Sequence, residues 1–176
     1  MMPLARRINH RQRPAPRANL LPMEDRISAL IALLDDSLWQ AADLETRRLL
    51  VENVDVGGYV GVDADEADDF DCTLLAAIDE AWAAASGGRF GFTAQERQLA
   101  SVMDEGFTGN DTWRQFGRAV GWVAGREWID SDDVLYDLSA PEGHLPYIPG
   151  ASTVVNTGRI YEGFMHFYAR VAACRE

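Results

Sequence analysis

The sequence contains no lysine, few histidines and cysteines, and no long apolar run. All 16 of its cations are therefore arginines, whose planar and permanently charged guanidinium groups can form two parallel hydrogen bonds with a carboxylate. A membrane-spanning helix needs about 18 or more consecutive apolar residues. The apolar runs of this chain are much shorter, so we expect no membrane span.

The three histidines, His10, His144 and His166, are too scattered in the sequence for a shared catalytic or metal site. The sequence also contains no nucleophile elbow, phosphate-binding loop or dinucleotide-binding fingerprint. We therefore predict that the protein is not an enzyme and that it has no catalytic residues, no metal site and no intrinsic cofactor.

The two cysteines, Cys72 and Cys174, match neither the spacing of zinc ligands nor that of a redox pair. We expect both to be small, semi-buried apolar residues in a reducing compartment. This interpretation predicts a cytoplasmic protein.

Charge is distributed unevenly along the chain, whose formal net charge is −12. Five arginines precede the first acid, Glu24, and the remainder carries 11 arginines against 28 acids, a balance of −17. Such a surface repels nucleic acid. Residues 1–19 are interpreted as a disordered basic tail. Two alternatives are an organelle transit peptide and a misassigned start codon, with the domain opening near Leu20.

The length of 176 residues fits one domain, assigned here to residues 20–176, which is large enough for a sizeable core. Apolar residues recur at the spacing of amphipathic helices in most of the chain. Helices are predicted over residues 23–34, 38–53, 73–85, 93–103 and 159–174. A further helix is predicted after the turn at Gly109-Asn110, and it would contain Trp113, Phe116 and Val120.

Two helix starts carry capping signals. Ser37 is expected to cap the second helix, and Thr93 with Glu96 forms the capping-box pattern of the fourth. Residues 63–71 contain six acids in nine positions, but they lack the glycine and the final glutamate of a calcium loop. We predict that this segment is a solvated loop.

Aromatic residues concentrate where the helical pattern is weakest. Phe90 and Phe92 alternate with glycines at a helix entry, and Trp122, Trp128 and Tyr136 follow in a segment predicted to contain short extended pieces and ordered loops. Rings on ordered loops can form an apolar ligand surface. Their alternative role is structural, as a hydrophobic staple that closes the start of the helix.

Several motifs occur in a fixed order along the chain. They are residues 39–46 and 75–86, GRFGFTAQ at 88–95, Phe116-Gly117, Gly121-Trp122, Trp128, and DLSAPEGHLP at 137–146. This ordered series resembles the genomes-uncoupled-four (GUN4-like) family of tetrapyrrole-binding proteins. The resemblance spans roughly residues 39 to 146, with weaker matches in the last helix.

The resemblance implies an all-α, compact, cupped domain of about six or more helices, with long ordered loops that form a concave face. It implies binding of protoporphyrin IX or magnesium protoporphyrin IX. In photosynthetic members it further implies activation of magnesium chelatase through its large subunit, or a role in tetrapyrrole sensing. The expected partners are thus a porphyrin and that subunit or another signalling protein.

A porphyrin is a wide apolar disc with carboxylates at one edge, so rings should stack on it and arginines should pair with its edge. We expect Arg89, Arg126 and Arg159 at that edge. The predicted ligand-binding residues are Arg89, Phe90, Phe92, Trp122, Arg126, Trp128, Tyr136, Leu138, His144, Leu145, Pro146 and Arg159.

The chain departs from the family pattern after Trp128, where photosynthetic members often carry basic and aromatic residues. Here residues 129–133 read IDSDD, and no arginine follows Pro146 until Arg159. An acidic rim disfavours porphyrin carboxylates. The alternative function is therefore a sensory or protein-interaction module with weak or no porphyrin affinity. A third hypothesis is an enzyme that acts on a tetrapyrrole with His144 as acid or base.

Overall fold

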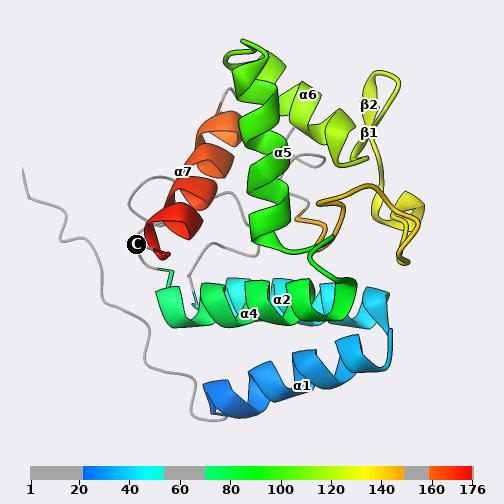
Figure 1. Cartoon of the computed structure of the whole chain (residues 1–176), viewed down its shortest axis with the longest axis vertical. Helices are drawn as coiled ribbons and strands as arrows, with labels where there is room; N and C mark the ends of the chain where they lie inside the picture. Colours follow the sequence, from blue (N-terminus) through cyan, green and yellow to red (C-terminus); the bar gives the residue numbers. More distant parts are fainter. Residues whose placement is uncertain (1–21, 54–69, 149–158, 176) are drawn as a thin grey trace, which may run out of the picture.

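The computed structural model describes residues 22–53, 70–148 and 159–175. Within these residues the chain forms six α-helices, one short 3-10 helix and one two-stranded hairpin, which confirms the predicted all-α class. The helices form two layers (Figure 1): α1, α2 and α4 lie across the base, and α5, α6 and α7 stand above them.

In the base layer, α1 (Met23–Asp35) packs against both α2 (Trp39–Asn53) and α4 (Cys72–Ser86). Leu30 and Leu34 of α1 are buried, as their helical spacing predicts. The prediction that Ser37 caps α2 is wrong, because Ser37 adopts a positive φ of 58° in the turn after α1 and Leu38 intervenes before the helix.

The two ends of α4 are fixed by local chemistry. The Asp71 side chain accepts the backbone N–H groups of Thr73 and Leu74 at the start of the helix. Gly87 ends it in the left-handed conformation, which glycine adopts without steric cost. The Nε1–H of Trp82 in α4 donates to Thr46 Oγ1 in α2 at 2.9 Å, so a buried polar contact joins the two helices.

The upper layer begins with α5 (Phe92–Asp104), whose start is capped by another helix. Asp79 of α4 accepts both the backbone N–H and the hydroxyl of Thr93, at 2.9 and 2.5 Å. The predicted capping box is therefore wrong: the carboxylate comes from α4, and Glu96 pairs with Arg175 instead. Gly91 precedes the helix at φ +106°, and a Cβ there would lie 2.6 Å from Asp79 Oδ1.

Helix α6 (Asn110–Ala119) and the hairpin of β1 (Val123–Ala124) and β2 (Glu127–Trp128) share an aromatic cluster. Trp113 stacks on Trp128 with ring centroids 5.3 Å apart, and Phe116 meets Trp122 edge to face at 5.5 Å. A 3-10 turn, η1 (Ser131–Asp133), follows the hairpin. Short extended pieces after Gly121 were predicted, and the hairpin confirms them.

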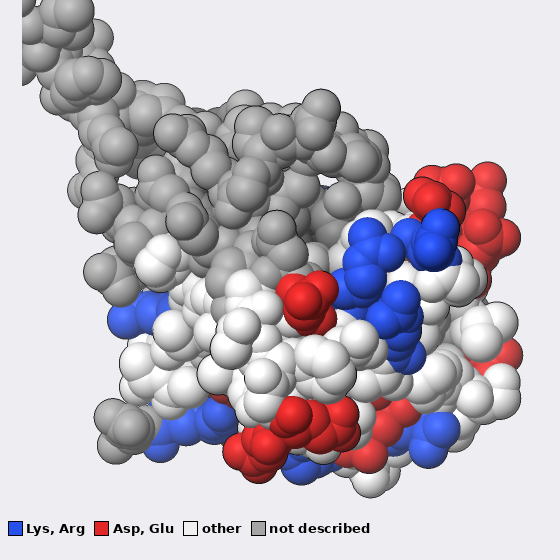
Figure 2. All heavy atoms as spheres, turned by 90° about the horizontal axis from the view of Figure 1, so that it is seen from above, with Lys and Arg blue, Asp and Glu red and all other residues white. Residues whose placement is uncertain are grey.

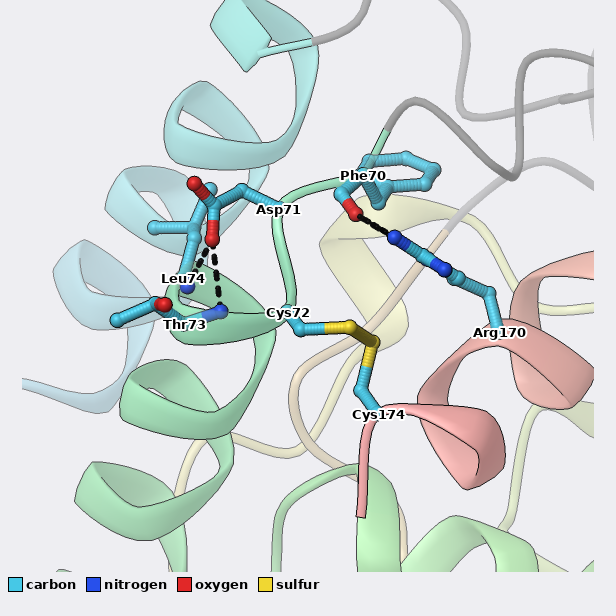
Figure 3. The surroundings of a disulfide bond; sticks show 7 residues. All are labelled: Phe70, Asp71, Cys72, Thr73, Leu74, Arg170 and Cys174. Atoms are coloured by element: carbon cyan, nitrogen blue, oxygen red, sulfur yellow. Dashed lines mark hydrogen bonds between the residues drawn. A yellow bond between two sulfur atoms is a disulfide. The ribbon is translucent and has the colours of Figure 1, made fainter. Parts of the chain in front are cut away.

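Helix α7 (Arg159–Ala173) closes the core against α4 and α5. Phe167 meets Phe70 and Phe92 edge to face, at 5.6 and 5.3 Å. The Arg170 guanidinium donates to the Phe70 carbonyl at 2.8 and 3.2 Å (Figure 3). The C-terminal helix is thereby attached to the segment that leads into α4.

Cys72 and Cys174 form a disulfide bond between the start of α4 and the residue that follows α7 (Figure 3). The prediction of two free cysteines is wrong. The fold brings together two residues separated by 102 positions, a proximity that sequence spacing cannot reveal. The expectation of a reducing compartment rested on free cysteines, so it loses this basis.

The predicted basic tail, residues 1–19, lies outside the described residues, as does most of the acidic segment 63–71. No helix in the described part of the chain is long and apolar enough to cross a bilayer.

Candidate functional site

The segment from residue 129 to residue 148 has little regular structure, and hydrogen bonds to the helices hold it in place. Gln95 of α5, which is fully buried, donates from Nε2 to the Pro146 carbonyl at 2.8 Å. The N–H of Gly91 donates to the Leu145 carbonyl at 2.9 Å, and Trp122 Nε1–H donates to the His144 carbonyl at 2.8 Å. These contacts attach the loop to the start of α5 and to the aromatic cluster.

His144 is the internal brace of this loop. Its Nε2 accepts the backbone N–H of Leu135 at 3.1 Å, so the ring proton is on Nδ1, which donates to the Val120 carbonyl at 2.6 Å. Burial lowers the pKa of His144, and the Val120 carbonyl and Asp137 oppose that shift. A buried, neutral ring with both nitrogens engaged has a structural role in this loop, and the contact of His144 with a ligand stays a prediction.

A buried carboxylate attaches the end of the loop to α2. Asp43 Oδ1 accepts the backbone N–H of Tyr147 at 2.6 Å, and Oδ2 lies 2.9 Å from Nη2 of Arg47. Burial raises the pKa of Asp43 from 3.8 to about 6, and the nearby Arg47 charge limits the rise. The Tyr147 hydroxyl donates to the Ile129 carbonyl at 2.8 Å, which closes the loop on itself.

An open cleft of about 420 Å³ lies between α2 and the segment that follows the hairpin. Its walls combine an apolar part, an aromatic ring and one cation. The lining residues are Gln40, Ala41, Leu44 and Arg47 from α2, and Ser131, Asp132 and Tyr136 from the loop. This volume is within the range of small-molecule sites, and the mixed lining suits a ligand with an apolar body and an anionic group.

Six of the predicted ligand-binding side chains are buried in the core, where other protein groups surround them, so their contact with a ligand stays a prediction. Phe90, Phe92 and Trp122 expose at most 1% of their surface, because these rings pack against other core rings. Both phenylalanines therefore have a packing role, Phe90 against rings of α2 and α4 and Phe92 against a ring of α7, and the hydrophobic staple stays a prediction. The other three buried residues are His144, Leu145 and Pro146.

Of the remaining predicted residues, those whose side chains the structure describes lie at the surface, and among them only Tyr136 lines the cleft. Trp128 is half-buried against Trp113, and Leu138 is 50% exposed. Arg126 is exposed, whereas the Arg89 guanidinium donates to the Ala140 carbonyl at 2.7 and 3.0 Å. The side chain of Arg159 lies outside the described part of the structure.

Sequence reasoning missed the contribution of α2. Asp43, Leu44 and Arg47 were interpreted as part of an ordinary amphipathic helix, although Asp43 falls within the family-like motif at 39–46. The available signal was an acid at a position that the helical period turns toward the core. A buried acid requires partners, and its partners here are the loop and Arg47.

On the face seen in Figure 2, groups of arginine side chains lie next to groups of acidic side chains. Arginines 114 and 118 of α6 donate to the backbone carbonyls of Arg126 and Gly125 in the hairpin turn. The cleft is on the α2 side instead, and Asp132 is at its wall. Within the described residues no group of histidine, cysteine or acidic side chains is arranged to hold a metal ion.

Comparison with known proteins gives a consistent set of similarities. A family model described as GUN4-like matches residues 22–161. A Ycf53-like protein from Synechocystis sp. is 34% identical over 84 residues, which are 47% of this chain and 33% of that protein. The matched stretch thus spans about a third of the curated relative's length.

Two solved structures share the fold. The ligand-free structure of Arabidopsis thaliana GUN4 superposes with a TM-score of 0.60 at 24% identity, over 85% of this chain and 97% of that one. The structure of GUN4 from Chlamydomonas reinhardtii gives a TM-score of 0.59 at 19% identity, over 92% and 94% of the two chains. At these identities the similarity shows a common architecture.

Proposed function

This chain belongs to the GUN4-like family, and from that premise we propose that it binds a porphyrin as a non-catalytic regulatory protein. Protoporphyrin IX and its magnesium form are the proposed ligands. The proposed regulatory role is activation of magnesium chelatase through its large subunit, or tetrapyrrole sensing.

The cleft beside α2 is the observation that supports this function. Leu44, Ala41 and the Tyr136 ring offer apolar surface to a flat macrocycle, and Arg47 offers a cation to its carboxylates. The charge of Asp132 at the wall repels an anionic ligand. The cleft should therefore bind a porphyrin more weakly than a cleft whose charged residues were all cations. The buried rings of the core support the site by holding its walls, without contacting the ligand.

Titration of the purified protein with protoporphyrin IX tests the proposal. Binding should shift the Soret band of the porphyrin and quench tryptophan fluorescence at micromolar protein. No spectral change at tens of micromolar porphyrin would reject the proposed function. The porphyrin should be recovered unchanged, and its conversion would favour an enzyme instead.

A matched pair of surface variants locates the site. Leu44 and Met103 are both exposed apolar residues, at 64% and 48%, but only Leu44 lines the cleft. Leu44→Asp should weaken porphyrin binding, because it places a charge against the apolar body of the ligand. Met103→Asp on α5 should leave binding unchanged. Equal effects of the two substitutions would place the porphyrin elsewhere.

A protein-interaction module is the second candidate, and one observation favours it. Leucines that are about half exposed lie just before α2, on α2 and on the loop, at Leu38, Leu44, Leu135 and Leu138. Exposed apolar side chains of this kind are common at protein interfaces. Titration with the large subunit of magnesium chelatase, with and without porphyrin, separates this candidate from the first. Association that is independent of porphyrin and lost in Leu44→Asp would support it.

A further inference from the structure

We infer that Arg47 receives the anionic group of the cleft ligand, and that Asp43 behind it makes ligand affinity depend on pH. This inference rests on the proposed porphyrin-binding function, because it assigns a carboxylate of the porphyrin to a particular cation. It concerns a residue pair on α2 that the family-like motifs of the loops do not include.

Arg47 is shared between the protein interior and the cleft. Its Nη2 lies 2.9 Å from Asp43 Oδ2, yet 24% of its side chain is exposed and it lines the cleft. Neither Arg47 Nε nor Asp43 Oδ2 makes a hydrogen bond of normal geometry, although both atoms are buried. The contact is therefore an ion pair without bidentate alignment, which leaves donor capacity on the guanidinium for an anion.

Asp43 has a second partner that keeps it in place whatever its charge. Its Oδ1 accepts the Tyr147 N–H at 2.6 Å, and the side chain is 0% exposed. A ligand carboxylate at Arg47 would therefore share one cation with a fixed carboxylate behind it. When Asp43 is protonated, the Arg47 charge is uncompensated and attracts the ligand. When Asp43 is ionised, the two charges largely cancel at the cleft.

The direction of the pH dependence follows from this arrangement. The pKa of Asp43 is about 6 without ligand, and a second negative group beside Arg47 would raise it further. Ligand binding is then coupled to uptake of a proton, so affinity should fall as pH rises above about 6. Linkage of one proton allows at most about a tenfold change in the dissociation constant per pH unit.

Other groups face the same pair and must be separated from it. Tyr136 and Tyr147 of the loop interact with both members of the pair. Asp132 lies close to Tyr136 and lines the cleft, and Asp130 lies close to Tyr147. The pKa values of both tyrosines are raised by burial, that of Tyr147 to about 12, so these hydroxyls stay neutral from pH 6 to 8. An Asp43→Asn variant removes only the Asp43 titration, because asparagine can still accept the Tyr147 N–H.

The experiment measures the dissociation constant of protoporphyrin IX between pH 6 and 8 for the full chain and three variants. Wild-type affinity should weaken across this range, whereas Asp43→Asn should bind with nearly constant and higher affinity. Arg47→Met should weaken binding by roughly 10- to 100-fold near pH 6 and abolish the pH dependence. Arg48→Met is the matched control, because Arg48 neighbours Arg47 but pairs with Glu45 outside the cleft.

The outcomes distinguish this inference from the proposed function. Binding that is unchanged in Arg47→Met, or a pH dependence that persists in Asp43→Asn, would overturn the inference while porphyrin binding stands. Absence of porphyrin binding by the wild type at every pH would reject both. Melting temperatures measured for each variant identify a loss of fold, and Arg47→Met still tests the inference if Asp43→Asn is unfolded.

Discussion

The carboxylate of Asp43 and the backbone N–H of Tyr147, which are 104 positions apart, meet at 2.6 Å in the protein interior. This hydrogen bond joins the second helix of the base to the end of the loop that forms the opposite wall of the cleft. Because Asp43 also contacts Arg47, one buried side chain connects the fold, the cleft and its cation.

Replacing Asp43 by alanine should destabilise the protein by about 3 to 5 kcal/mol, because the Tyr147 N–H loses its acceptor and Arg47 loses its counter-ion. Chemical denaturation at pH 7 measures the loss. Asp43→Asn keeps the acceptor and should lose clearly less stability at this pH. A similar loss in both variants would show that the acceptor function is unimportant.

The pH dependence of stability should carry the signature of Asp43. Its folded-state pKa is raised from 3.8 to about 6, so the folded state binds the proton more tightly than the unfolded state. The resulting stabilisation is complete below about pH 3.8 and is lost as pH rises through about 6. Between pH 4 and 8 the wild type should therefore lose unfolding free energy relative to Asp43→Asn as the pH rises. A constant difference would contradict the raised pKa.

His144 should act in the opposite direction. Its pKa is lowered by burial, so the unfolded state binds the proton more tightly than the folded state. Stability that is present above about pH 6.5 should be lost as pH falls below that value. His144→Leu in an Asp43→Asn background isolates this contribution, because the opposing titration is absent. We expect the variant to lose the decline in stability between pH 7.5 and 5.5, and persistence of that decline would refute the assignment.

Removal of the disulfide should lower stability without altering the core. The bond joins residues 102 positions apart, and a loop of that length corresponds to about 4 to 5 kcal/mol in the chain-entropy description. The double variant Cys72→Ser, Cys174→Ser should melt at a lower temperature than the oxidised wild type. Dithiothreitol should lower the melting temperature of the wild type only. Two titratable thiols in the unreduced, denatured wild type would show that the bond is absent.

Phe92 and Leu138 were both predicted to bind ligand, but one is in the core and the other is at the surface. Their substitution by alanine should therefore change stability by very different amounts. Phe92 is fully buried and meets Phe167 edge to face, so Phe92→Ala should cost about 3 to 5 kcal/mol. Leu138 is 50% exposed, and Leu138→Ala should change stability by no more than about 0.5 kcal/mol. Thermal or urea unfolding of the two variants checks the difference. Comparable losses would mean that the loop is packed more tightly than its exposure indicates.

The helices could be predicted from the sequence because their evidence is local. The period of Leu30 and Leu34 in α1, and the glycine that ends α4 at Gly87, each lie within a few residues of the element that they define. Their boundaries fell within a few residues of the observed ones. The motif resemblance also identified the family, since several ordered stretches had to coincide.

The partners of individual side chains could not be predicted, because those partners are distant in sequence. Thr93 has a suitable glutamate three residues later, yet Asp79 of another helix takes its place. An aromatic residue such as Phe90 or Trp122 gives the same sequence signal whether its ring faces a ligand or the core. Its actual position depends on how the surrounding helices pack. The candidate cleft was missed on its α2 side for the same reason, because Leu44 and Arg47 carry no motif that identifies a site.

The bond between Cys72 and Cys174 makes the backbone from the start of α4 to the end of α7 a covalent ring. A single break of the peptide chain anywhere inside that ring therefore yields no separate fragments. On an electrophoresis gel without reductant, a nicked molecule should keep the mass of the intact chain, and two pieces should appear only after reduction. Limited proteolysis of this protein thus has to be compared under both conditions before a region is judged resistant to cleavage.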